Sequence, residues 1–182
     1  PHLCADRIDY ALREFPQEVV DRCLSDLAVK EGLFVFRTIE SAGVFARHFL
    51  QQQRENWAGF EAVSRYHIFA KVLSRALATH IIVFDDLWRD DPYMIAKLDA
   101  AHDEEIAKTL KILRRRSLQG FPRSAEFFKK KFRYVDPDII LGERLVCLSE
   151  VDEGFKKELR EAREHNNKGI QVAMLDDTFN TS

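Results

Sequence analysis

Apolar residues recur at helical spacing through most of the chain. The pattern predicts helices over residues 3–14, 17–30, 39–50, 60–77 and 102–116, because apolar positions three and four residues apart form one stripe on a helix. Residues 60–77 are apolar nearly all round, which is typical of a central buried helix. Most of the chain is therefore expected to be helical.

Several residues mark where these helices begin and end. The first helix is expected to stop before Pro16, because the residue preceding a proline disfavours helical geometry. Gly32 ends the second helix, and Thr38 can cap the third. Asp91-Pro92 supplies a cap followed by proline at the first position of a further helix. Residues 33–36 are expected to form an apolar connector and residues 84–88 a short helical turn.

The sequence texture changes after Gly120-Phe121-Pro122. Residues 132–135, 139–141 and 144–148 are strand-like, and a last helix is expected from Ser149, with Asp152 as its capping partner, to about His165. The fold class predicted is mainly α, with a small β element near the C-terminus. The domain division predicted is a helical portion over 1–119, an α+β appendage over 120–165 and a flexible tail over 166–182.

Composition excludes several classes of protein. With 46% hydrophobic and 32% charged residues the chain is typical of a globular protein, and 28 Lys and Arg against 30 Asp and Glu give a net charge of −2. This balance gives no reason to expect nucleic acid or a membrane as partner. The three cysteines are far apart, so no zinc ribbon or disulfide framework is indicated.

An intracellular location, cytoplasmic or nuclear, is expected. The chain starts at Pro1, directly in a predicted helix, which indicates a fragment.

The first predicted helix is dense in polar groups. Asp6, Asp9, Tyr10 and Arg13 share one face at i, i+3, i+4 and i+7. Such a face suits the wall of a polar cleft, and it equally suits a surface helix with internal ion pairs. In a cleft, Asp6 could bind a hard cation, Arg7 and Arg13 could bind phosphate oxygens, and Tyr10 could donate a hydrogen bond.

The segment from Ala5 to Tyr10, followed by Leu12-Arg13-Glu14, resembles a motif of HD-domain phosphohydrolases, in the branch of the deoxynucleoside triphosphate triphosphohydrolases. The resemblance implies an HD-type helical bundle and a metal-dependent hydrolysis of a phosphate ester. It implies that Asp6 is the last metal ligand, that Arg7 and Tyr10 face substrate phosphates, and that Glu14 meets the sugar.

The same resemblance implies a divalent metal (Mn, Mg, Fe, Zn or Ni). Its other ligands, a histidine and a His-Asp pair, would precede Pro1, so this chain alone is not expected to bind the metal. The polar face of the first helix is then expected to be open to solvent. The nucleotide branch of the family usually has Asp at the position of Glu14 and a Tyr/His-Thr-Gly turn soon after it, where this chain has Phe15-Pro16-Gln17. The substrate therefore stays open between a triphosphate, a monophosphate and another phosphomonoester.

Other candidate ligands have ordinary structural explanations. His102-Asp103 follows the motif instead of preceding it, and the acids at the start of that helix match the helix dipole. His2 could share a cation with Asp6 across one helix turn, which would be too few ligands. His67 is expected in the core. The acidic residues Asp85, Asp86, Asp90 and Asp91 lack the regular spacing of an EF-hand cation loop, so they are expected to form a solvated cap.

A basic and aromatic stretch, Lys129-Lys130-Lys131 with Arg133 and Tyr134, could bind a nucleotide, or it could be a solvated strand. Two other functions therefore stay open beside the phosphohydrolase. One is a non-catalytic module for homo-oligomerisation or partner binding, with an apolar patch on helix 39–50 or 60–77. The other is a regulatory nucleotide-binding protein. Trp57 and Trp88 are expected as core or interface anchors.

Overall fold

The computed structural model describes residues 3–175 of the chain, and contacts divide these residues into two units. Unit 1 comprises residues 3–59 and 128–170, and unit 2 comprises residues 60–127 and 171–175. Neither unit is continuous in sequence. The division therefore does not follow the predicted boundaries at 119 and 165. Part of the predicted tail belongs to these units, and residues 176–182 lie outside the described residues.

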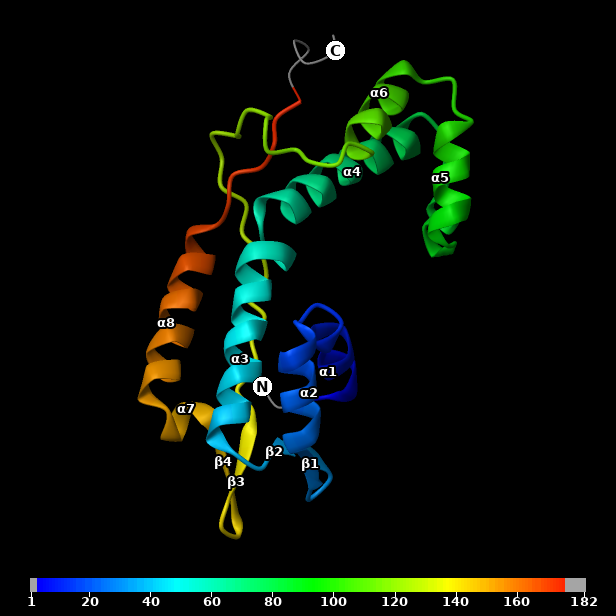
Figure 1. Cartoon of the computed structure of the whole chain (residues 1–182). Coiled ribbons are helices and arrows are strands. Elements are labelled where there is room, and N and C mark those ends of the chain that lie inside the picture. The colour runs from blue at the N-terminus through cyan, green and yellow to red at the C-terminus, as the bar shows by residue number, and fades with distance from the viewer. Residues whose placement is uncertain (1–2, 176–182) are drawn as a thin grey trace. The chain divides into compact units, whose positions relative to one another are not determined.

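Unit 1 combines helices with a sheet (Figure 1). Its helices α3 and α8 run side by side. Its elements, in chain order, are α1 (Ala5–Leu12), α2 (Gln17–Asp26), β1 (Leu27–Lys30), β2 (Leu33–Phe36), α3 (Ile39–Gln52), the π-helical turn η1 (Gln53–Trp57), β3 (Asp138–Leu141), β4 (Arg144–Cys147), α7 (Leu148–Val151) and α8 (Glu153–Lys168).

The four strands form one mixed sheet in the order β1-β2-β3-β4. β1 and β2 are an antiparallel hairpin, in which Glu31 and Gly32 turn the chain at φ values of 56° and 77°. Positive φ at both central residues is the geometry of a two-residue hairpin turn, and glycine adopts it at little cost. β2 then pairs in parallel with β3, with Val35 opposite Asp138. β3 and β4 form a second antiparallel hairpin.

The core of unit 1 lies around α3. Phe45 and Phe49 of this helix are fully buried, and they pack against Phe36 of β2 and Phe155 of α8 within one hydrophobic cluster. α1 adds Ile8 and Ala11 to the same cluster. Burial of large aromatic side chains provides most of the stability that such a core can have.

The expected HD-type helical bundle is wrong. A four-stranded mixed sheet lies in unit 1, and half of it comes from residues 27–36, far from the C-terminus. The stripe that predicted a helix to residue 30 stops at Asp26, because the hairpin takes Leu27–Lys30 as a strand. Residues 132–135, expected as a strand, form none, whereas the predicted strands near 139–141 and 144–148 are confirmed as β3 and β4.

Unit 2 is helical in its described part. It contains α4 (Phe60–Ala78), the 3₁₀ turn η2 (Phe84–Trp88), α5 (Asp91–Asp99) and α6 (Glu104–Leu113). One face of α4 packs against α6 and the cluster around Leu98 and Ile106, but Tyr66 of α4 is 69% exposed. α4 is therefore buried along one stripe and is not the fully enclosed helix that the apolar run predicted.

Helix caps in the structure are mostly acidic side chains. Asp103 accepts hydrogen bonds from Glu105 N and Ile106 N at 3.0 Å, and Asp90 caps α5. Thr38 caps α3 as predicted. Asp152 caps α8, whereas the predicted cap, Ser149, instead donates its hydroxyl and its amide to Asp136. Each cap satisfies backbone N–H groups that have no partner within the helix.

Asp86 of η2 is the most strongly perturbed acid of unit 2. Its side chain is 8% exposed and accepts from Lys97 Nζ at 2.6 Å, Val83 N at 2.7 Å and Tyr93 OH at 2.8 Å. The Lys97 hydrogen bond, aided by those from Val83 and Tyr93, lowers the pKa of Asp86 from 3.8 to about 2. The carboxylate is therefore the form that the folded unit prefers.

Unit 2 is expected to lose stability as the pH falls from about 4 to about 2. A depressed folded-state pKa stabilises the fold above the unfolded pKa, and this contribution disappears as the pH falls through the folded pKa. Asp86→Asn should be less stable at pH 7 and should show a flatter pH dependence in this window. Urea unfolding from pH 7 to pH 2 measures this, with the exposed neighbour Asp85→Asn as control. An unchanged pH slope in Asp86→Asn would contradict the assignment.

Candidate functional site

The predicted polar helix is α1, which turns its apolar side to the core. Ile8 and Ala11 are buried, whereas Asp6 and Asp9 are exposed. The opposite side of α1 is accordingly polar, and part of it borders a hollow. The polar face of α1 was expected to be open to solvent: Asp6 and Asp9 are exposed, but Tyr10 of the same face is half-buried.

Asp6, Arg7 and Tyr10 line a hollow of about 500 Å³ on unit 1. Its other wall is the irregular segment from Lys131 to Tyr134. The structure thus brings together two stretches that are separate candidates in the sequence. Three cationic side chains and one carboxylate line the hollow, so its charge favours an anion.

Tyr10, which lines this hollow, packs against two aromatic side chains. Its ring lies 5.1 Å from Trp57 and 6.0 Å from Phe49, measured between ring centroids. Burial raises the pKa of the Tyr10 phenol, and the nearby guanidinium groups of Arg7 and Arg133 partly offset that rise. The hydroxyl is therefore protonated at neutral pH and can donate a hydrogen bond to an anion.

The segment opposite α1 is braced by α8. The rings of Phe132 and Tyr134 stack with centroids 5.2 Å apart. The guanidinium of Arg163 lies over both rings, at 5.3 Å and 5.0 Å from their centroids. Cation–π contacts of this kind hold an otherwise irregular segment in one place, which positions Arg133 and Lys131 near α1.

The other predicted residues of the motif lie outside the hollow. Arg13 forms two hydrogen bonds with Asp9, at 3.0 Å and 3.1 Å, and this bonding raises the pKa of the guanidinium. The pair is an exposed i,i+4 ion pair, which is the surface alternative that the sequence left open. Glu14 is exposed, and its backbone carbonyl accepts from Gln52.

The alternative ligand candidates have structural roles or lie elsewhere. Asp103 caps α6, in agreement with the helix-dipole interpretation. It also pairs with Arg75 at 2.9 Å, a contact that the sequence did not predict. Burial lowers the pKa of His67 on α4. His2 lies outside the described residues. Trp57 belongs to the core of unit 1, whereas Trp88 is 82% exposed.

Metal ligands do not gather in this site. Among residues 3–175, no group of three or more His, Cys, Asp or Glu side chains could hold a metal ion. Asp6 is the one carboxylate among the residues that line the hollow. The donor set present here does not fit a divalent cation, which needs several oxygen or nitrogen ligands.

Comparisons with known proteins give one relative. The chain is 27% identical over 184 residues to the uncharacterized protein YdhJ of Bacillus subtilis (strain 168), in a match that covers 96% of this chain and 56% of YdhJ. The chain therefore spans little more than half the length of that relative. No protein-family model and no solved structure matches this chain. Within the described part, no helix is long and apolar enough to cross a membrane.

Proposed function

We propose that the hollow beside α1 binds the phosphate group of a nucleotide or another phosphate ester. The observation that carries the proposal is the meeting of Asp6, Arg7 and Tyr10 with Lys131 and Arg133 around one hollow. Guanidinium groups match phosphate oxygens as planar, two-pronged donors, and a lysine ammonium adds a point charge. The Tyr10 hydroxyl supplies a neutral donor.

The activity that we propose for the whole protein is metal-dependent hydrolysis of that phosphate ester. The support is the resemblance of residues 5–14 to the phosphohydrolase motif, in which Asp6 is a metal ligand and Arg7 faces substrate. The side chains described here do not form a metal site, so the chemistry assigned to this chain is binding and orientation of the phosphate. Arg7, Lys131 and Arg133 would hold its oxygens, and Tyr10 would donate to one of them.

Arg133→Gln is expected to weaken binding of pyrophosphate about tenfold, because a charge-assisted hydrogen bond to an anion is lost. Lys131→Gln should act in the same direction. Isothermal titration at low and high salt measures this, and added salt should weaken binding to the native chain. The matched control is Lys129→Gln, at a lysine two residues before Lys131 that does not line the hollow. Equal affinities for all of these variants would remove the hollow as the phosphate site.

Asp6→Asn separates binding from hydrolysis. It removes a negative charge beside the anion, so pyrophosphate binding should persist or tighten. Hydrolysis of phosphate esters by the protein with Mn²⁺ should disappear, because the proposed metal ligand is lost. Hydrolysis that survives Asp6→Asn would exclude this residue from the mechanism.

A second candidate function, self-association or partner binding without catalysis, is favoured by one observation. Val83, Phe84, Leu87 and Trp88 expose 37–82% of their surfaces in and beside η2 of unit 2. The apolar patch expected on residues 39–50 or 60–77 is replaced by this one, and exposed apolar clusters commonly mark interfaces. If the chain does not bind pyrophosphate but forms an oligomer in analytical ultracentrifugation, the second function is supported over the first.

A further inference from the structure

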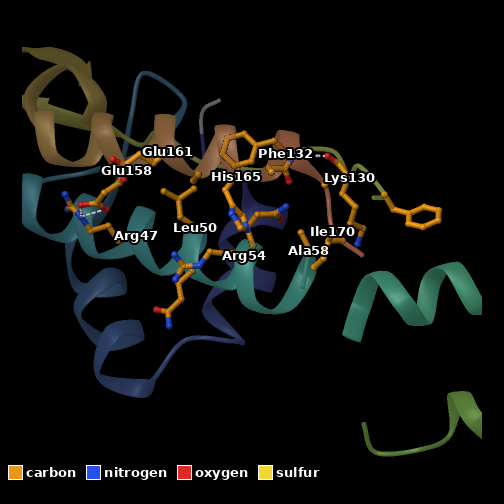
Figure 2. A pocket seen from close by; sticks show the side chains of 16 residues that line it. Arg47, Leu50, Arg54, Ala58, Lys130, Phe132, Glu158, Glu161, His165 and Ile170 are labelled. Carbon is orange, nitrogen blue, oxygen red and sulfur yellow. Dashed lines mark hydrogen bonds and ion pairs between the residues drawn. The ribbon is translucent and has the colours of Figure 1, made fainter. Parts of the chain in front are cut away.

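A second cavity lies in unit 1. It has a volume of about 480 Å³ and is bordered by α3 and η1 on one side, by α8 on another, and by residues near Phe128 and Lys130. Figure 2 shows side chains of the first side, among them Leu50 and Arg54, across from Glu161 and His165 of α8. This volume is in the range of small-molecule sites.

The π-helical turn η1 shapes one wall of this cavity. Ala58 N donates to Gln53 O at 2.8 Å, which is the i+5 hydrogen bond of a π-turn. Such turns are rare and often occur at functional sites. The wider turn places Gln53 in the cavity wall, where it is 5% exposed.

Gln53 carries an unsatisfied polar atom. Its Oε1 is buried and has no hydrogen-bond partner among residues 3–175. A buried amide oxygen without a donor loses its hydrogen bonds to water and gains none in return, so native proteins rarely retain one. A molecule in this cavity that offers a hydrogen-bond donor would remove that cost.

The cations of the cavity wall already have partners. Arg47 forms an ion pair with Asp152 at 2.9 Å and with Glu158 at 3.0 Å, as the dashed lines in Figure 2 mark for Glu158. Arg54 pairs with Glu55 at 2.8 Å. Lys130 donates to the backbone oxygen of Trp57 at 2.8 Å, and burial lowers its pKa. The cavity is therefore a poor site for a second phosphate.

The rest of the wall is mixed, with the polar residues Gln51, Glu161, His165 and Asn166 beside apolar and aromatic ones. Leu50, Ala58 and Ile170 provide aliphatic surface, and Phe128 and Phe132 provide rings. A neutral ring system with few polar groups would lose little hydration here and would gain apolar contacts. The combination of a ring-lined cavity and one acceptor without a donor defines the ligand class.

We infer that this cavity binds a neutral nitrogen heterocycle of the nucleobase kind, whose N–H group donates to Gln53 Oε1. The site is separate from the phosphate hollow, although Phe132 lines both. The inference does not rest on the proposed phosphate binding, because a nucleoside carries no phosphate.

The test titrates the chain with adenosine, guanosine, cytidine and uridine, following heat and Trp57 fluorescence in a Trp88→Phe background. At least one nucleoside should bind. Gln53→Met, an apolar near-isostere, should weaken that binding tenfold or more while leaving the unfolding midpoint unchanged or higher. Gln52→Met, next in sequence but outside the cavity wall, should have no effect on binding.

Three further measurements test where the nucleoside binds. Ala162→Phe should block the nucleoside by filling the cavity, and Arg133→Gln, which affects the phosphate hollow, should leave nucleoside affinity unchanged. For adenosine as ligand, N6,N6-dimethyladenosine should bind more weakly, because its exocyclic amine has no N–H. Binding of no nucleoside, or binding that is indifferent to both Gln53→Met and Ala162→Phe, would overturn the inference and leave the phosphate proposal untouched.

Discussion

Phe49→Ala is expected to destabilise unit 1 by about 3–5 kcal/mol, because it leaves a cavity where a fully buried ring stood. Phe49 is the aromatic side chain of α3 that contacts both α1 and η1. Its ring centroid lies 5.1 Å from that of Trp57, 6.0 Å from Tyr10 and 6.4 Å from Phe45. Domains of ordinary size have only about 5–15 kcal/mol of total stability, so this loss is a large fraction.

Phe49→Ala should also weaken anion binding in the phosphate hollow. Tyr10 rests on Phe49, so its hydroxyl loses a fixed position and pyrophosphate should bind more weakly. Urea unfolding followed by far-UV circular dichroism, and by Trp57 fluorescence in a Trp88→Phe background, measures the stability change. Phe84→Ala, at a phenylalanine that is 67% exposed, is the control and should change stability by less than about 0.5 kcal/mol. A loss of similar size in both variants would contradict the assignment of Phe49 to the core.

Gly59→Ala is expected to cost about 2–3 kcal/mol through a backbone clash. Gly59 is the second residue after the π-turn, and a Cβ atom there would lie 2.1 Å from the carbonyl oxygen of Glu55. Backbone atoms cannot move aside as the end of a flexible side chain can. The turn must therefore rewind, which would also move Gln53 and reshape the cavity.

Gly120→Ala is the matched control for this clash, because a Cβ at Gly120 meets no atom within 4 Å. Alanine there restricts the unfolded chain, so the control should be neutral or slightly stabilising. Thermal unfolding compares the two variants, and nucleoside titration reports whether the cavity changed. Equal stability of Gly59→Ala and Gly120→Ala would show that the turn accommodates a side chain freely.

Periodicity in the sequence identified most helices because their apolar stripes face a core. The prediction failed at Leu27–Lys30, where the residues continue the stripe of α2 yet form β1. The signal that was missed is Glu31-Gly32, a two-residue hairpin turn without the usual asparagine or aspartate. Parallel pairing of β2 with β3 joins segments about a hundred residues apart, and no local pattern encodes such a contact.

The candidate site was predictable in its parts but not in its assembly. The helical face of Asp6, Tyr10 and Arg13 was correct as a periodicity, yet Arg13 pairs with Asp9 outside the hollow. The stretch around Arg133 stood out by its charge, but its place opposite α1 depends on tertiary packing under Arg163. Gln53 could not be identified from the sequence, because its burial and its missing hydrogen bond become visible only in the folded structure.

The parallel β2–β3 pair has a consequence for folding during synthesis on the ribosome. During synthesis from the N-terminus, β2 leaves the ribosome long before residues 138–141, and all of α4, α5 and α6 emerge in between. For that interval β2 presents an unpaired strand edge, which is prone to pairing with other chains. Translation speed and chaperone supply should therefore affect the yield of native protein more strongly than its final stability would suggest.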